Sequence, residues 1–193
     1  MPLKYFQNTK LGNGKSISTD KVKEGQQLTS LQIDNGLSKV STNTVIKEHG
    51  IFPKEAWKGF KISWDGGHVY CTENQVFLLN DYTTATAQEL KAQQSELLGT
   101  DFKPQKVTSI EAGMVMCGRK RITLDGAEND ISGHLLPLGG VWVGDEYLEQ
   151  QVKLGHFNNY SSEYIYPGNA LARTMRRLMM AMMGEKEDTI EKT

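Results

Sequence analysis

The chain has 193 residues, of which 38 % are hydrophobic and 23 % are charged; this is typical of a globular protein with a packed core and excludes disordered and collagen-like chains. Its formal net charge of −1 gives no long-range attraction to nucleic acid or to an anionic membrane surface, because both need clustered Lys and Arg. We therefore expect neither nucleic acid nor a membrane as a partner.

The cysteines and the N-terminal residues indicate the compartment. Cys71 and Cys117 are the two cysteines, too few for a disulfide framework and too far apart for a zinc knuckle, so two reduced thiols are favoured over one bridge. Polar sequence follows Met1–Phe6 directly, and no stretch approaches the ~20 apolar residues that span a bilayer. We expect an intracellular protein, cytoplasmic or, if phage-derived, part of a virion, with no metal and no cofactor.

Short apolar or β-branched runs alternate with turn residues from residue 11 to about residue 80, a pattern typical of an all-β domain built from short strands. Because Gly and Asn tolerate positive φ, turns are predicted at Gly12-Asn13-Gly14, Asp34-Asn35-Gly36 and Asp65-Gly66-Gly67. The alternation breaks near Glu73-Asn74, which predicts a bulge or loop there instead of one long strand.

Beyond residue 80 the pattern predicts a surface helix and further strands. Residues 86–98 carry a thin apolar stripe between a Thr86 cap and a Gly99 stop, which indicates a short helix on the surface. Strands are expected at 106–110, 114–117, 120–124, 134–138 and 139–145. The last of these is short, apolar and flanked by glycine, which favours a buried strand.

A second helix is predicted over residues 170–183, between Pro167-Gly168-Asn169 and Gly184. Its apolar face is formed at helical spacing by Leu171, Met175, Leu178, Met179 and Met182, with Arg173, Arg176 and Arg177 to the side. Methionine adapts to irregular apolar surfaces on partners as well as on the home core. Two interpretations stay open: this helix packs on its own β domain, or it binds a neighbouring subunit.

Several sequence blocks occur in the order found in a known self-cleaving module. They are Thr9–Ile17 with Val22–Leu28, then Val69–Phe77 with Ala87–Lys91, and finally Arg121–Asp125 followed by His134 and Gly140–Asp145. The blocks resemble those of the Hint (hedgehog and intein) family, including the spacing from the histidine to the last residue of the final block. The resemblance extends from about residue 9 to residue 145 and implies the compact Hint β fold; an unrelated small β barrel or sandwich is the alternative.

The resemblance also implies a chemistry whose residues are largely replaced. In the family a Cys, Ser or Thr at the first position attacks the preceding carbonyl, but the matching position falls near Lys4 and the chain opens with Met1, so we expect no upstream segment to release. The middle-block histidine, a general acid, is matched by Gln75, whose amide cannot donate a proton in that way. Gly144 and Asp145 occupy the positions of the penultimate histidine and the cyclising terminal asparagine.

Thr72 and His134 keep their family positions. A lone histidine at a strand end is more often a hydrogen-bonded scaffold residue than a catalyst. Cys71 adjoins Thr72 and offers an alternative nucleophile, although a cysteine in a strand is usually a small buried hydrophobic residue. The vestigial site, in which we expect no catalytic residue, comprises Thr72, Gln75, His134, Gly144 and Asp145.

These observations predict a mainly β, Hint-like domain over residues 1–145 and a C-terminal extension over 146–193 that carries the helix at 170–183. We expect a non-catalytic structural or binding module that assembles with other protein subunits as a homo- or hetero-oligomer, a role that suits a phage virion. The predicted partner-binding residues are Arg173, Met175, Arg176, Arg177, Leu178, Met179 and Met182. The alternative is a residual autoprocessing enzyme that uses Thr72, His134 and Asp145 with Cys71 as nucleophile.

Overall fold

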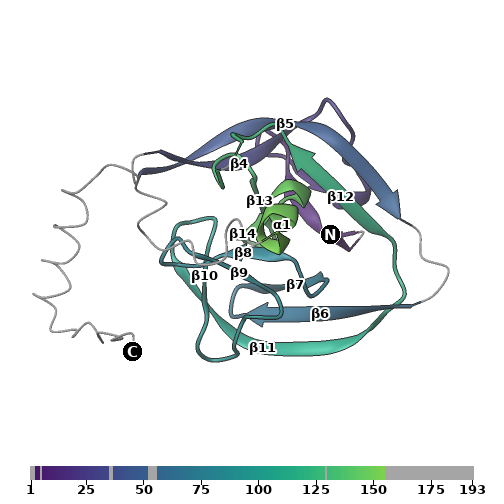
Figure 1. Ribbon diagram of the computed structural model, residues 1–193, viewed down its shortest axis with the longest axis vertical. Coiled ribbons are helices and arrows are strands. Elements are labelled where there is room, and N and C mark those ends of the chain that lie inside the picture. The colour runs from purple at the N-terminus through teal and green to yellow at the C-terminus, as the bar shows by residue number, and fades with distance from the viewer. Residues whose placement is uncertain (1–2, 5, 35–36, 52–55, 129, 155–193) are drawn as a thin grey trace, which may run out of the picture.

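A computed structural model describes residues 3–4, 6–34, 37–51, 56–128 and 130–154 (Figure 1). Antiparallel sheets dominate this part of the chain, as the sequence predicts. The long strands of the largest sheet arch over one side of the molecule and the strands of a second sheet over the other, with the helix α1 between them (Figure 1). The predicted helix at 170–183, with its proposed partner-binding residues, lies outside the described residues.

The largest sheet has eight strands. In spatial order they are β1 (Leu3–Lys4), β12 (Arg119–Leu124), β5 (Leu37–Ile51), β4 (Gln27–Asp34), β13 (Leu135–Leu138), β14 (Val141–Gly144), β8 (Val76–Leu78) and β9 (Thr84–Thr86). A four-stranded sheet contains β10 (Glu96–Leu98), β11 (Pro104–Val115), β6 (Trp57–Trp64) and β7 (Gly67–Cys71). A small hairpin, β2 (Asn8–Lys10) with β3 (Ser16–Ser18), precedes a single 3₁₀ turn at Thr19–Lys21, and α1 spans Glu146–Lys153.

The predicted turns connect antiparallel strands. Strands β4 and β5 pair in register up to Asp34 opposite Leu37, on either side of the second turn. Strands β6 and β7 meet at Trp64 opposite Gly67, around the third turn. The break expected near residue 73 is confirmed, because β7 ends at Cys71 and β8 begins only at Val76.

The prediction of a helix over residues 86–98 is wrong. Strand β9 ends at Thr86 and β10 occupies Glu96–Leu98, with turns between them. The Glu89 carboxylate accepts hydrogen bonds of 2.8 Å from both the backbone and the hydroxyl of Thr86, a contact that also starts helices. Here the chain turns away, Gln93 adopts a positive φ of 64°, and pairing with β11 outweighs the local helix propensity.

Two further expectations need correction. The strands predicted at 106–110 and 114–117 are one continuous strand, β11, which pairs along its length with β6. The residues just after 145, where no helix is predicted, form α1, which packs on the β domain through Leu148 and Val152. The predicted boundary at residue 145 stays a prediction, because most of the extension lies outside the described residues.

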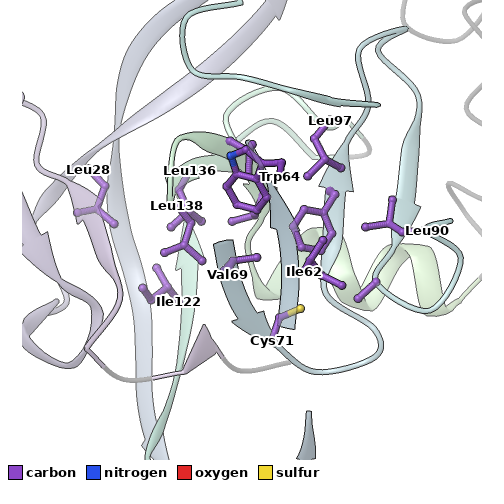
Figure 2. Close-up of a cluster of buried hydrophobic side chains, with 14 of the residues drawn as sticks. Leu28, Ile62, Trp64, Val69, Cys71, Leu90, Leu97, Ile122, Leu136 and Leu138 are labelled. Atoms are coloured by element: carbon purple, nitrogen blue, oxygen red, sulfur yellow. The ribbon is translucent and has the colours of Figure 1, made fainter. Parts of the chain in front are cut away.

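The core divides into two clusters. The larger lies between the two main sheets, where residues such as Ile62, Val69, Cys71 and Leu136 are fully buried (Figure 2). The smaller places Leu148 of α1 against the side chains of the β-sheet around it. Both cysteines are free thiols, Cys71 buried and Cys117 half-buried. No helix among the described residues is long and apolar enough to cross a bilayer.

Gln7 fastens the N-terminal segment to the exposed edge of the four-stranded sheet. Its side-chain oxygen accepts a 2.7 Å hydrogen bond from the Tyr70 backbone N–H, and its Nε2 donates to the Tyr70 carbonyl at 2.9 Å. The carboxamide thus substitutes for a neighbouring strand at β7. This pairing satisfies edge groups that would otherwise be open to another chain.

Replacement of Gln7 by leucine is expected to lower the free energy of unfolding by about 1–3 kcal/mol, because both Tyr70 backbone groups lose their partner. Chemical denaturation monitored by circular dichroism measures the change. The matched control is Gln88→Leu, at an exposed glutamine, which should change stability by less than about 0.5 kcal/mol. Equal effects of the two substitutions would contradict the structural role given to Gln7.

Candidate functional site

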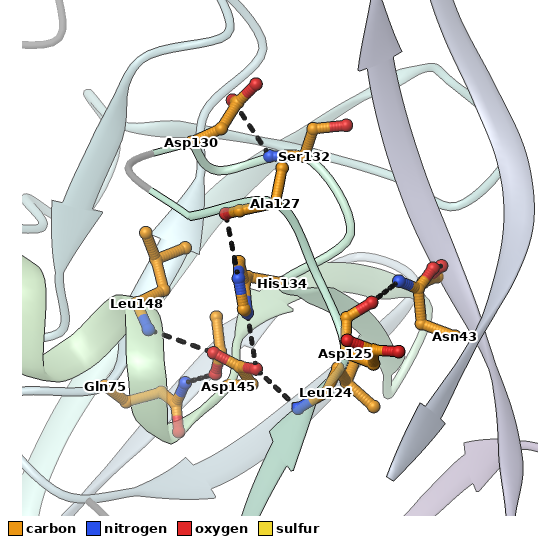
Figure 3. A network of polar contacts seen from close by, with 12 residues as sticks. Asn43, Gln75, Leu124, Asp125, Ala127, Asp130, Ser132, His134, Asp145 and Leu148 are labelled. Carbon is orange, nitrogen blue, oxygen red and sulfur yellow. Dashed lines mark hydrogen bonds and ion pairs between the residues drawn. The ribbon is translucent and has the colours of Figure 1, made fainter. Parts of the chain in front are cut away.

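His134 and Asp145 lie opposite each other because they flank the open end of the β13–β14 hairpin. Leu135 pairs with Gly144, and the backbone N–H of Asp145 donates to the His134 carbonyl at 2.9 Å. The side chains follow the same register, with His134 Nδ1 2.9 Å from Asp145 Oδ2 (Figure 3). Strand pairing therefore brings together two of the five vestigial positions that the sequence marks.

The His134 imidazole is enclosed and fully engaged in hydrogen bonds. Only 3 % of its surface is exposed, its Nε2 lies 3.2 Å from the Ala127 carbonyl, and the Tyr147 ring stacks on it with centroids 4.2 Å apart. A Cβ at Gly126 would come within 2.6 Å of the ring, so only glycine fits there. Both ring nitrogens thus face groups of the fold, and the burial of the ring leaves neither open to a substrate.

Asp145 joins several segments through one carboxylate. Its Oδ1 accepts from the Leu148 N–H at 2.9 Å, which caps the N-terminus of α1. Its Oδ2 accepts from the Leu124 N–H at 2.8 Å as well as contacting His134. The buried charge is thereby matched by three donor groups from β12, α1 and the residue before β13, which is the condition for placing a carboxylate inside a protein.

Gln75 binds the backbone at the C-terminal end of β14. It is fully buried, and its Nε2 donates to the Gly144 carbonyl at 2.8 Å and to the Val76 carbonyl at 3.2 Å. A histidine at Gly144 would require its neighbours to shift, because an added Cβ would lie 3.0 Å from Val76 and from Leu148. Gln75 therefore bonds the backbone at the place where the Hint family resemblance sets a pair of histidines.

Cys71 and Thr72 lie at the start of the turn that carries Gln75, whose N–H donates to the Thr72 carbonyl at 3.1 Å. Thr72 is 4 % exposed. Cys71 belongs to the larger apolar cluster, and burial raises the pKa of its thiol far above the usual range. A thiol that stays protonated is a poor nucleophile, so this geometry opposes the use of Cys71 in catalysis.

Sequence reasoning missed the residues that complete this network. Leu124 and Ala127 contribute only backbone groups, and no side-chain pattern reveals a backbone donor or acceptor. The α1 cap could have been found, since Asp145 followed by Glu146 and Glu149 is a helix-start pattern with acidic residues in the first turn. No group of metal-ligating side chains is found among the described residues.

Comparison with solved structures identifies the fold. A bacterial intein-like domain from Clostridium thermocellum superposes with a TM-score of 0.62 at 13 % identity, over 75 % of this chain and 98 % of that one. A DnaB intein from Synechocystis gives 0.60 at 15 % identity, and the gp41-1 intein 0.56 at 16 %, each over 75 % of this chain and 98 % of its own. The sequence matches no protein-family model and no curated protein.

The chain therefore has the intein-like Hint fold over three quarters of its length, and the expected fold class is confirmed. At these identities the likeness defines the fold and not the activity. The chemistry at the site has to be argued from this chain's own residues.

Substitution of Asp145 by alanine is expected to lower the free energy of unfolding by about 2–4 kcal/mol, because the Leu124 and Leu148 N–H groups and the His134 ring lose their acceptor. Asp145→Asn, which keeps a capping oxygen, should lose less. Thermal and chemical denaturation measure the order of the two variants. Asp101→Ala, which removes an exposed carboxylate bonded to the Lys103 N–H, is the control and should cost less than about 1 kcal/mol. Equal losses from Asp145→Ala and Asp101→Ala would contradict the central role of Asp145.

Proposed function

We propose that this Hint module is non-catalytic and serves as a structural or binding module that assembles with other protein chains. The observation that carries the proposal is the state of Asp145, which matches the family's cyclising terminal asparagine. Its carboxylate is occupied by three donors and caps a helix through which the chain continues. A phage virion is one setting that suits a small module of this kind.

The peptide bond that self-cleavage would have to break lies at the first turn of α1. The Asp145 carbonyl accepts a 3.2 Å hydrogen bond from the Glu149 N–H, so attack on it by the Asp145 side chain would have to undo both the helix start and the carboxylate contacts. Gln75 cannot supply a proton to a departing nitrogen. Each of these features supports a fold that keeps the Hint scaffold without its reaction.

Residual autoprocessing is the rival function. It needs a nucleophile, and burial of Cys71 disfavours the thiolate. It also needs a proton carrier, but both His134 nitrogens face acceptors within the fold. The observations that support the non-catalytic proposal are the same ones that weigh against this rival.

The purified chain is expected to keep its intact mass during long incubation at neutral pH under reducing conditions. Mass spectrometry should find no fragment ending at Asp145. The Asp145→Asn variant, which restores the family's terminal residue, should also stay whole, because Gln75 and the α1 capping geometry remain. Thr72→Ala serves as a baseline for non-specific hydrolysis. A fragment ending at residue 145 in the wild type, absent from Thr72→Ala, would establish autoprocessing and overturn the proposal.

Assembly is proposed to use the amphipathic pattern of residues 170–183. Met175→Lys combined with Met179→Lys is expected to dissociate the oligomer while the β domain stays folded, because two charges are placed on the apolar face of the predicted helix. Native mass spectrometry measures the oligomer and circular dichroism the folding. Met180→Lys, on the opposite side of the predicted helix, is the control and should leave the oligomer intact. Loss of folding in the first variant would favour packing on the home domain instead.

A further inference from the structure

Five basic residues share one face of the β1–β12–β5 edge of the large sheet. Directly paired residues in antiparallel strands lie on the same face, and Lys4 pairs with Arg119 while Arg121 pairs with His49. Residues two apart on a strand share a face as well, which adds Lys47, the partner of Thr123. We name this set the cationic face: Lys4, Lys47, His49, Arg119 and Arg121.

The cationic face lies on the side of β12 opposite the one that packs into the larger apolar cluster. The residues that alternate with it on β12 are buried, namely Lys120, Ile122 and Leu124. Lys120 forms an ion pair with Glu48 on that inner side, so its charge is neutralised within the fold. By contrast, Lys47 and His49 are exposed and the two arginines are half-buried.

Among the described residues, Glu146 is seen to pair with this face, 3.1 Å from Arg121, and it can balance one of the five basic residues. Burial and the neighbouring charge of Arg121 lower the pKa of Arg119 from its ordinary value. The Nε atoms of Arg119 and Arg121 are also buried from solvent without a hydrogen-bond partner among the described residues. The buried Nε atoms are out of a ligand's reach, but cations in excess of the paired Glu146 fit an anionic ligand.

Two of the cations form cation–π contacts with aromatic rings. Lys4 Nζ lies 3.9 Å from the centroid of the Tyr70 ring, and the Arg119 guanidinium lies 5.0 Å from that of Trp57. These contacts limit the motion of side chains that would otherwise be flexible, so less conformational entropy is lost when a ligand binds. The edge of the sheet therefore carries partly ordered cations close to the end of β14 and the start of α1.

We propose that the cationic face binds an extended acidic segment of a partner protein, with carboxylates two residues apart matched to Arg119 and Arg121. Alternate side chains of an extended chain project to one side about 7 Å apart, the same repeat as the two arginines on β12. Each guanidinium can receive a carboxylate through charge-assisted hydrogen bonds. Lys4 and Lys47, on the neighbouring strands, widen the cationic face beyond what a single small anion covers.

Protein carboxylates suit this face better than nucleic acid does. The overall charge of −1 gives no long-range attraction to a long polyanion. Binding of single strands also relies on open aromatic faces for base stacking. Here the Tyr70 and Trp57 rings already carry Lys4 and Arg119.

The inference rests on the proposed assembly with other protein chains and names the chemistry of one partner. A fluorescein-labelled synthetic peptide of alternating glycine and glutamate is titrated with the full chain and followed by fluorescence anisotropy. The glutamate peptide should bind at least about tenfold more tightly than one of alternating glycine and glutamine, because the charge-assisted bonds are lost with the amide. Binding should weaken as ionic strength rises from about 0.05 to about 0.3 M.

Variants assign the binding to the proposed residues. Arg119→Gln with Arg121→Gln should reduce affinity for the glutamate peptide at least about tenfold, whereas lysine at both positions should lose less because the charge remains. Lys10→Gln with Lys15→Gln removes two exposed cations elsewhere and should leave affinity unchanged. If the arginine pair proves necessary for folding, Lys4→Gln with Lys47→Gln provides the second test, with a fall of several-fold expected.

The outcomes separate this inference from the proposed function. Equal binding of both peptides, or equal loss from the arginine and control variants, overturns the cationic face as an acidic-segment site. Tighter binding of a single-stranded oligothymidylate of the same length overturns the choice of partner. Intact mass measured on the same preparation tests the non-catalytic proposal independently. A self-cleaved chain contradicts that proposal. An intact chain that does not bind the acidic peptide contradicts only this inference.

Discussion

The buried carboxylate of Asp145 is the interaction on which the centre of the molecule depends. It accepts hydrogen bonds from the backbone of Leu124 and Leu148 and contacts the ring of His134, so β12, β13 and α1 are fixed relative to the end of β14 by one side chain. A carboxylate is costly to bury unless such donors surround it. Because each donor belongs to a different element, the network forms only when the tertiary fold is complete, and it then disfavours any other register of the central strands.

The same contacts support the proposal that this Hint fold remains without its reaction. At three of the five vestigial positions the residue has a structural role: Gln75 binds the Gly144 carbonyl, Gly144 leaves space for Val76 and Leu148, and Asp145 caps α1. An active site needs groups that can release and regain protons, whereas these contacts hold the backbone in place. In the proposed assembly role, the residues that bind partners are those of the cationic face and of the predicted helix at 170–183.

Sequence and structure agree where the signal is local. Glycine and asparagine at the turns predicted the β4–β5 and β6–β7 hairpins, and the glycine-flanked run before Asp145 predicted a buried strand, which β14 is. The failures occur where distant pairing competes with local preference. Residues 86–98 have the composition of a helix, yet Glu96–Leu98 gains more from pairing with β11. The sequence does not predict α1, because a helix of only eight residues depends on packing more than on its own propensity.

The sequence by itself determined that the chain is mainly β and where its turns fall, because these properties depend on residue type and spacing. From the resemblance it also predicted which family positions lack a nucleophile, a general acid and a cyclising asparagine. Only the tertiary structure decided what the replacements do. The three donors on Asp145, the closed environment of His134 and the burial of Cys71 all come from segments far apart in the chain. The shared face of Lys4, Arg119 and Arg121 likewise depends on strand register, which no single stretch of sequence encodes.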